Sequence, residues 1–163
     1  MHRCAGVFFF GLKVGFCLFI LTILSPFQGV PQSLAQKNYP EGLVLNDEVF
    51  VLRESAKVGG KIVLNGSAKL TVDKAKVEIV REAGDFNAPE ITTNDSSQLH
   101  IVNGAEVTLN SQEGTAPQVT TNGSSQIHLK QRSKLHLITG SSAPFITMND
   151  ESRIVLTQAY LGP

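Results

Sequence analysis

The sequence contains no tryptophan and only two cysteines, Cys4 and Cys17. If residues 1–35 are removed during export, no thiol remains, which excludes disulfide bonds and thiol chemistry from the rest of the chain. Two of the 14 basic residues precede residue 36, whereas all 14 acidic residues follow it. Residues 36–163 therefore carry 12 minus 14 charges, or −2, which excludes a general nucleic-acid-binding surface.

The first 35 residues have the order of a secretory signal peptide. Arg3 and Lys13 supply positive charge, residues 14–24 form a run that is apolar apart from Thr22, and the following polar stretch ends at Ala35. Lys13 interrupts the longest apolar window, and an apolar run of eleven residues is too short to span a bilayer. We therefore expect cleavage after Ala35 and a single domain over residues 36–163. That domain would be secreted, periplasmic or at the cell surface, with no membrane association.

An eleven-residue segment recurs in the remaining sequence, with Asn at its fourth position and alternating apolar residues in its second half. Its four copies begin at Ile62, Ile91, Val119 and Ile146, and a weaker fifth copy contains Asn46. A period of two predicts strands with one buried face, and no segment beyond residue 35 has a helical period of useful length. Because the same unit recurs in the same order, we expect coils stacked about 4.8 Å apart.

Stacking predicts that like side chains lie above one another in columns through the core. Three such columns are expected, formed by Leu70, Leu99, Ile127 and Ile154, by Val72, Ile101, Leu129 and Leu156, and by Val77, Val107, Leu135 and Leu161. One asparagine stands at the same position in each copy, which predicts a further, polar row: Asn65, Asn94, Asn122 and Asn149. We expect these asparagines to face inward at a turn, to adopt positive φ, and to bond amide to carbonyl along the row.

The coil length and this row of asparagines resemble the right-handed parallel β-helix proteins, which include pectate-lyase-like proteins and autotransporter-type adhesin passengers. The resemblance covers about residues 43–161 and concerns the fold. It implies an all-β, right-handed parallel β-solenoid of about five coils. Left-handed solenoids are marked by a six-residue repeat, which this sequence lacks.

Six residues form the ligand face that the sequence predicts. His100 and His128 occupy equivalent outward positions on neighbouring coils, but two histidines without a carboxylate do not make a zinc site, so we expect no metal or cofactor. The dense basic cluster is formed by Lys130, Arg132, Lys134 and His136. It is suited to gripping an anionic polysaccharide or lipid head groups; the alternative is a solvated corner that keeps a strand soluble.

Three longer insertions, at residues 81–89, 110–117 and 138–144, each end in Ala-Pro. Insertions at one corner of a repeat stack into one face, which is often the binding face. Asn65, Asn94 and Asn122 also begin N-glycosylation patterns, although a role in the turn explains them better.

Function follows less directly than fold. The paired acidic residues of polysaccharide hydrolases and the clustered carboxylates of lyases are missing, so we expect no catalytic residues. The preferred function is a noncatalytic, adhesin-like or structural module that binds a polysaccharide or a surface protein. One alternative is a structural protein that self-associates end to end through open coil edges. The other is a polysaccharide lyase or hydrolase, which the fold alone does not support.

Overall fold

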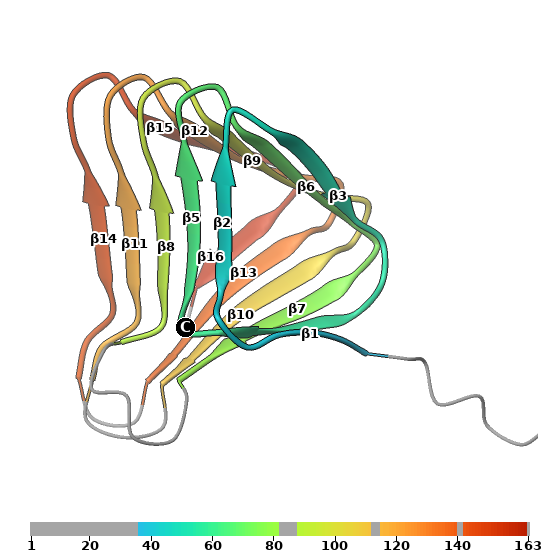
Figure 1. Ribbon diagram of the computed structural model, residues 1–163. Coiled ribbons are helices and arrows are strands. Elements are labelled where there is room, and N and C mark those ends of the chain that lie inside the picture. The colour runs from blue at the N-terminus through green and yellow to red at the C-terminus, as the bar shows by residue number, and fades with distance from the viewer. Residues whose placement is uncertain (1–35, 82–87, 112–114, 140–141, 163) are drawn as a thin grey trace, which may run out of the picture. The chain divides into compact units, whose positions relative to one another are not determined.

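The computed structural model describes residues 36–81, 88–111, 115–139 and 142–162, which belong to one compact unit of strands and turns. These ranges contain no helix, and hence none that is long and apolar enough to cross a membrane. The predicted signal peptide, residues 1–35, lies outside the described residues. The prediction of an all-β parallel solenoid is confirmed, because every strand pairs in parallel with the equivalent strand of a neighbouring coil (Figure 1).

Three parallel sheets, named here A, B and C, form the sides of the solenoid (Figure 1). Sheet A contains six strands: β1 (Lys37–Tyr39), β4 (Ala56–Gly59), β7 (Lys76–Val80), β10 (Glu106–Ser111), β13 (Lys134–Thr139) and β16 (Tyr160–Gly162). The outward side chains of these strands are mostly polar, because Lys, Glu and Thr alternate with buried Val and Leu along the chain. This alternation leaves one face of sheet A available for contacts with other molecules.

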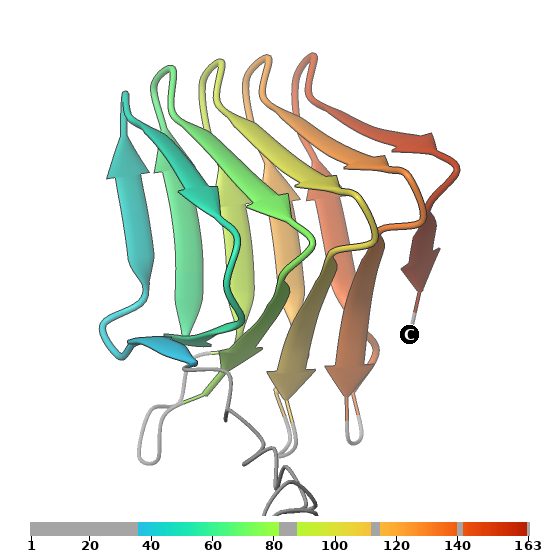
Figure 2. The same ribbon diagram turned by 90° about the vertical axis from the view of Figure 1, so that its right-hand side faces the viewer.

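Sheet B follows β1, β4 and their equivalents along the chain. Its strands are β2 (Leu43–Asn46), β5 (Lys61–Asn65), β8 (Glu90–Thr93), β11 (Gln118–Thr121) and β14 (Phe145–Met148). A tight turn then leads to sheet C. As Figure 2 shows, equivalent strands lie side by side along the stack.

Sheet C completes each coil and leads back to sheet A. Its strands are β3 (Val49–Leu52), β6 (Lys69–Asp73), β9 (Gln98–Val102), β12 (Gln126–Lys130) and β15 (Arg153–Thr157). We call β2, β3 and β4 the N-terminal coil, and β14, β15 and β16 the C-terminal coil.

The pairing register confirms that like residues stack in the three predicted columns, although Leu156 at the C-terminal end is 49% exposed rather than buried. In sheet C, Leu99 pairs with Leu70 and Ile127, and Ile101 pairs with Val72 and Leu129. In sheet A, Val107 lies between Val77 and Leu135 in the same way. These side chains are fully or almost fully buried, so the periodic apolar residues form one continuous core.

The predicted row of asparagines is also present, at the corner between sheets B and C. The side-chain Nδ2 of Asn65, Asn94, Asn122 and Asn149 donates to Oδ1 of the asparagine one coil earlier, beginning with Asn46, at 2.7–2.8 Å. The prediction that these side chains face inward was wrong. Ile62 and Leu64 of β5 are buried, so strand alternation turns the next residue, Asn65, outward. The asparagines that begin glycosylation patterns are thus members of this ladder.

The predicted positive φ belongs to the residue after each ladder asparagine rather than to the asparagine itself. The residues at this position are Asp47, Gly66, Asp95, Gly123 and Asp150, with φ between 56° and 67°. The asparagine is the last residue of β2 and β5 and directly follows β8, β11 and β14, and the chain turns one residue later. Glycine and aspartate both accept the left-handed conformation there.

Asp and Gly alternate along this turn column for a physical reason. The backbone N–H of Gly66 donates to Asp95 Oδ2 at 3.0 Å, and that of Gly123 donates to Asp150 Oδ2 at 3.1 Å. A Cβ atom at Gly66 would collide with the carboxylate of Asp47, so glycine makes room for its acidic neighbours. Alternation also keeps successive carboxylates two strand spacings apart, about 9–10 Å, which reduces their repulsion.

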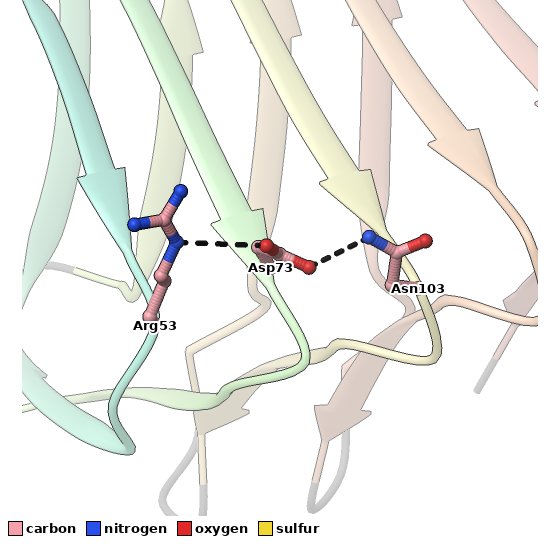
Figure 3. A network of polar contacts seen from close by, with 3 residues as sticks. All are labelled: Arg53, Asp73 and Asn103. Atoms are coloured by element: carbon pink, nitrogen blue, oxygen red, sulfur yellow. Dashed lines mark hydrogen bonds and ion pairs between the residues drawn. The ribbon is translucent and has the colours of Figure 1, made fainter.

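The corner between sheets C and A has its own polar contacts (Figure 3). The carboxylate of Asp73 accepts a hydrogen bond from Asn103 Nδ2 at 2.7 Å and lies 3.7 Å from Arg53 Nε. Positive φ recurs at this corner in Lys74, Asn103, Gln131 and Gln158. Because Arg53 and Asn103 belong to the coils on either side, Asp73 ties three consecutive coils together.

Candidate functional site

His100 and His128 lie side by side on the outward face of sheet C. Their rings are 4.7 Å apart between centroids and inclined by 34°. Each Nε2 bonds to Oε1 of the glutamine two residues earlier, Gln98 or Gln126, at 3.0 and 2.9 Å. Two stacked rings do not direct their nitrogens at one common ion. Among the described residues, no group of three or more His, Cys, Asp or Glu is placed to hold a metal.

Burial makes both imidazoles neutral near pH 7. Desolvation, followed by repulsion from His128, Lys69 and Lys130, lowers the pKa of His100 to about 4. Desolvation, together with Lys130 and Lys69, also lowers the pKa of His128. The two histidines therefore contribute no positive charge to the predicted ligand face.

The predicted basic cluster is spread over two sheets and the corner between them. Lys130 ends β12 in sheet C, Arg132 lies in the following turn, and Lys134 and His136 belong to β13 in sheet A. Lys134 Nζ lies 3.2 Å from the carboxylate of Glu106, so its charge is largely neutralised. The His136 ring lies 5.9 Å from that of Tyr160. The cluster is thus no single anion-binding patch.

The outward face of sheet A carries a groove of about 440 Å³. Its polar lining includes Lys76, Glu78, Glu106, Thr108 and Asn110, with Ile138 as an apolar part of the wall. The register of β7, β10 and β13 places these side chains in adjoining columns. The repeat pattern does not indicate that these residues line a groove, and Asn110 and Ile138 were expected in the insertions.

The polar side chains of the groove are matched to one another. Glu106 lies between Lys76 and Lys134, with N–O distances of 3.4 and 3.2 Å. The hydrogen bond from Lys134 is the main reason why the pKa of Glu106 is lowered, and Lys76 adds to the effect. The amide of Asn110 donates to Glu78 Oε1 at 3.0 Å. The groove therefore offers paired charges and hydrogen-bonding groups without a large net charge.

The predicted binding face at the Ala-Pro insertions includes residues 82–87, 112–114 and 140–141, which lie outside the described residues. Asn110 and Ile138, where two of the insertions were expected to begin, still belong to β10 and β13. The C-terminal ends of all three insertions are described, and two of the prolines accept backbone hydrogen bonds from the next coil. The carbonyl of Pro89 accepts from the backbone N–H of Gln118, and that of Pro117 accepts from Phe145. The prolines thus close the insertions in register, where each chain segment enters sheet B.

Comparison of the chain with protein-family models, curated proteins and solved structures finds no match. The predicted resemblance to parallel β-helix proteins is confirmed for the fold by the parallel stacking and the asparagine ladder. Function must then be inferred from the surfaces of this chain itself.

Proposed function

We propose that the protein is an exported, noncatalytic β-solenoid that binds a neutral polysaccharide in the groove of sheet A. The carrying observation is the row of paired polar side chains that lines this groove on β7 and β10. A carboxylate, an amide and a hydroxyl at successive positions suit the many hydroxyl groups of a sugar polymer. Along the stack, Lys76, Glu106 and Lys134 follow one another at about 4.8 Å, so the groove offers polar groups of different kinds in a line to an extended ligand.

The charges of the groove favour a neutral ligand over an anionic one. Glu106 already pairs with Lys76 and Lys134, and Glu78 beside them brings the formal charge of these four residues to zero. A uronate polymer would have to compete with Glu106 for these lysines and would meet the carboxylate of Glu78. A neutral glycan can hydrogen-bond to the same groups without displacing an ion pair.

The state of the two glutamates supports a noncatalytic function. A carboxylic acid that donates a proton during glycoside hydrolysis needs a raised pKa, whereas the lysines lower the pKa of Glu106. Glu78 is held by Asn110, and its register partner on β10 is Thr108 rather than a second acid. Release of new reducing ends or unsaturated products from a broad set of polysaccharides would contradict this part of the proposal.

A pair of matched variants tests the groove. Thr108→Arg places a long side chain in the groove, where Glu78 on the adjacent strand can partner it. Thr120→Arg is the control, because Thr120 is an equally outward threonine on sheet B. On a glycan array we expect Thr108→Arg to reduce binding of neutral glycans at least tenfold and Thr120→Arg to leave it unchanged. Equal binding by both variants, or binding of a host surface protein only, contradicts the proposed ligand.

We also propose export with removal of residues 1–35 and a right-handed solenoid of about five coils. The basic, apolar and small-residue order of the N-terminus supports export. The five strands in each of sheets B and C support the number of coils. The test of export is the mass of the protein recovered from outside the cytoplasm of an exporting host: we expect an N-terminus at Gln36, and a retained Met1 contradicts the prediction.

A further inference from the structure

The C-terminal coil exposes side chains that the rest of the solenoid buries. The same columns can be compared at both ends of the stack. Leu43 and Leu45 are 8% and 4% exposed in β2, whereas their equivalents Ile146 and Met148 in β14 are 41% and 58% exposed. In sheet C, Leu52 is 2% exposed and Leu156 is 49% exposed. The C-terminal coil therefore presents the open end of the hydrophobic core.

The strands of this coil also lack the protection usual for sheet edges. Within β14, β15 and β16, Arg153 is the single charged residue. Edge strands of soluble proteins commonly carry charges or prolines that discourage pairing with another chain. Three uncharged or nearly uncharged edges beside exposed core residues are typical of an interface.

The N-terminal coil is not complementary to this end. There the rings of Tyr39 and Phe50 pack against the core and meet edge to face, with centroids 6.4 Å apart. The additional strand β1 pairs with β4 and continues sheet A beyond the coil. A second copy of the chain consequently offers one end with exposed core residues, and it is the same C-terminal coil.

We propose that two copies of the chain associate through their C-terminal coils, related by a two-fold axis perpendicular to the stack. Such a contact buries Ile146, Met148 and Leu156 of both copies and continues the sheets from one copy into the other. The two-fold axis reverses the strand direction, so the sheets join in antiparallel fashion. The assembly is closed, because each copy contributes the end at which its core columns are exposed and keeps the covered N-terminal coil at the far end.

The exposed area is consistent with a dimer. Ile146, Met148 and Leu156, which belong to the core columns, are 41%, 58% and 49% exposed. At roughly 200 Å² for each fully exposed side chain, they offer about 300 Å² per copy. A specific interface buries about 800 Å² per partner, so the edges of three strands and the neighbouring outward side chains of Phe145 and Tyr160 need to supply the rest.

Head-to-tail stacking is opposed by charge. Continuing the turn column from one copy to the next would place Asp47 directly on Asp150, without the glycine that separates carboxylates elsewhere in the column. Tail-to-tail contact avoids this clash if the two-fold axis does not pass through the corner between sheets B and C. The axis then places the Asp150 turns of the two copies at different points around the stack.

Sedimentation of the full chain, produced in an exporting host, tests the proposal over a wide range of concentration. We expect a monomer–dimer equilibrium with no larger species. Met148→Lys places a charge in the proposed interface at a position that is already exposed in the monomer, so we expect at least a hundredfold weaker dimer. Val44→Lys is the matched control: Val44 is similarly exposed, but it lies on the outward face of the N-terminal coil. A strictly monomeric wild type, growth beyond the dimer, or equal loss in both variants would overturn the proposal.

Spin labels give a second test that does not depend on a destabilising substitution. Val44 and Thr147 occupy the same outward column of sheet B, four strand spacings apart. With Cys4 and Cys17 replaced by Ala, single labels are placed at Val44→Cys or Thr147→Cys. In a tail-to-tail dimer the two Val44 labels are nine strand spacings apart along the stack, which is about 43 Å. The two Thr147 labels are one spacing apart along the stack, about 4.8 Å. Equal distances for the two labels would show head-to-tail stacking and overturn the proposal.

Discussion

The two ends of the solenoid are built from equivalent strands, yet the core residues are buried at one end and exposed at the other. At the N-terminal coil, Leu43, Leu45 and Leu52 are covered, and Tyr39 and Phe50 fill the space beside them. At the C-terminal coil, the residues in the same columns are exposed. A repeat therefore specifies what lies inside a coil, whereas the N-terminal end also uses Tyr39 of the additional strand β1, which lies outside the repeat.

The polar ladders show the same contrast between the middle and the ends. An interior asparagine such as Asn94 both donates to and accepts from its neighbours, whereas Asn46 uses only its acceptor and Asn149 only its donor. Likewise Asp95 and Asp150 accept from the glycine of the preceding coil. Asp47 lies in the first coil of the part that the structure describes, and it accepts instead from the backbone nitrogen of Ser67 in the next coil, at 2.7 Å. Ladder energies should thus depend on position in the stack.

The largest expected difference in stability is between alanine substitutions of one core column at the two ends of the stack. Leu52→Ala removes a buried side chain, so we expect the free energy of unfolding to fall by about 2–5 kcal/mol. Leu156→Ala truncates the same column where it is half exposed, and we expect a loss below about 1 kcal/mol. Urea denaturation of dilute, monomeric protein measures both. Equal losses would show that the C-terminal coil is covered in solution.

The turn column is tested by adding a carboxylate in its interior. Gly123→Asn and Gly123→Asp share the same crowding, because a Cβ atom there would lie 2.8 Å from the Asp95 carbonyl oxygen. We expect both to lose about 1–3 kcal/mol of unfolding free energy. Gly123→Asp places a charge between Asp95 and Asp150 and should lose about 1–2 kcal/mol more. Urea denaturation at low and high salt measures this difference. It should shrink at 1 M salt, and an unchanged difference would contradict charge spacing as the reason for the alternation.

The asparagine ladder should lose more from its middle than from its end. Asn122→Ala removes two ladder bonds and leaves unpaired groups on both neighbours, so we expect a loss of about 1–3 kcal/mol. Asn149→Ala removes one bond at an exposed position, and we expect about 0.5–1.5 kcal/mol. Thermal denaturation of the two variants at equal concentration measures the order. The reverse order would mean that the ladder is not a set of additive neighbour contacts.

Most of the fold could be predicted from the sequence because equivalent positions in the repeat copies stack on one another and share one environment. The columns through Leu99, Ile101 and Val107 follow directly from the repeat register. The turn geometry was less accessible, since a shared asparagine does not reveal whether it or the next residue takes positive φ. Hydroxyl pairs such as Thr93 with Ser125, 2.9 Å apart and buried, were missed because each hydroxyl finds its partner on the next coil.

The candidate site was predicted less well, for a different reason. The sequence shows that Lys134 is basic, but only the pairing of β13 with β10 shows that Glu106 neutralises it. The groove depends on the space between side chains of three strands, which a repeat pattern does not describe. Residues that interact along the stack are about 28 positions apart in the chain, so a cluster that looks dense in the sequence need not be dense in space.

The smallest expected effect is a pH dependence of the unfolding free energy that comes from the two histidines in the middle of the stack. His100 has its pKa lowered to about 4 in the folded protein, against an ordinary value of 6.5 in the unfolded chain. Between these values the unfolded chain binds more protons, so the stability that neutral His100 contributes is complete above pH 6.5 and is lost as the pH falls toward 4.

We therefore expect the urea midpoint of the wild type to fall more steeply from pH 7 to pH 5 than that of His100→Gln. His128→Gln should also flatten the curve, because the pKa of His128 is itself lowered and His128 contributes to lowering the pKa of His100. Asp47 and Glu106, whose pKa values are lowered, are present in all three proteins and cancel in the comparison. Parallel curves for wild type and His100→Gln would mean that water reaches the stacked rings and that the middle of sheet C is no drier than its ends.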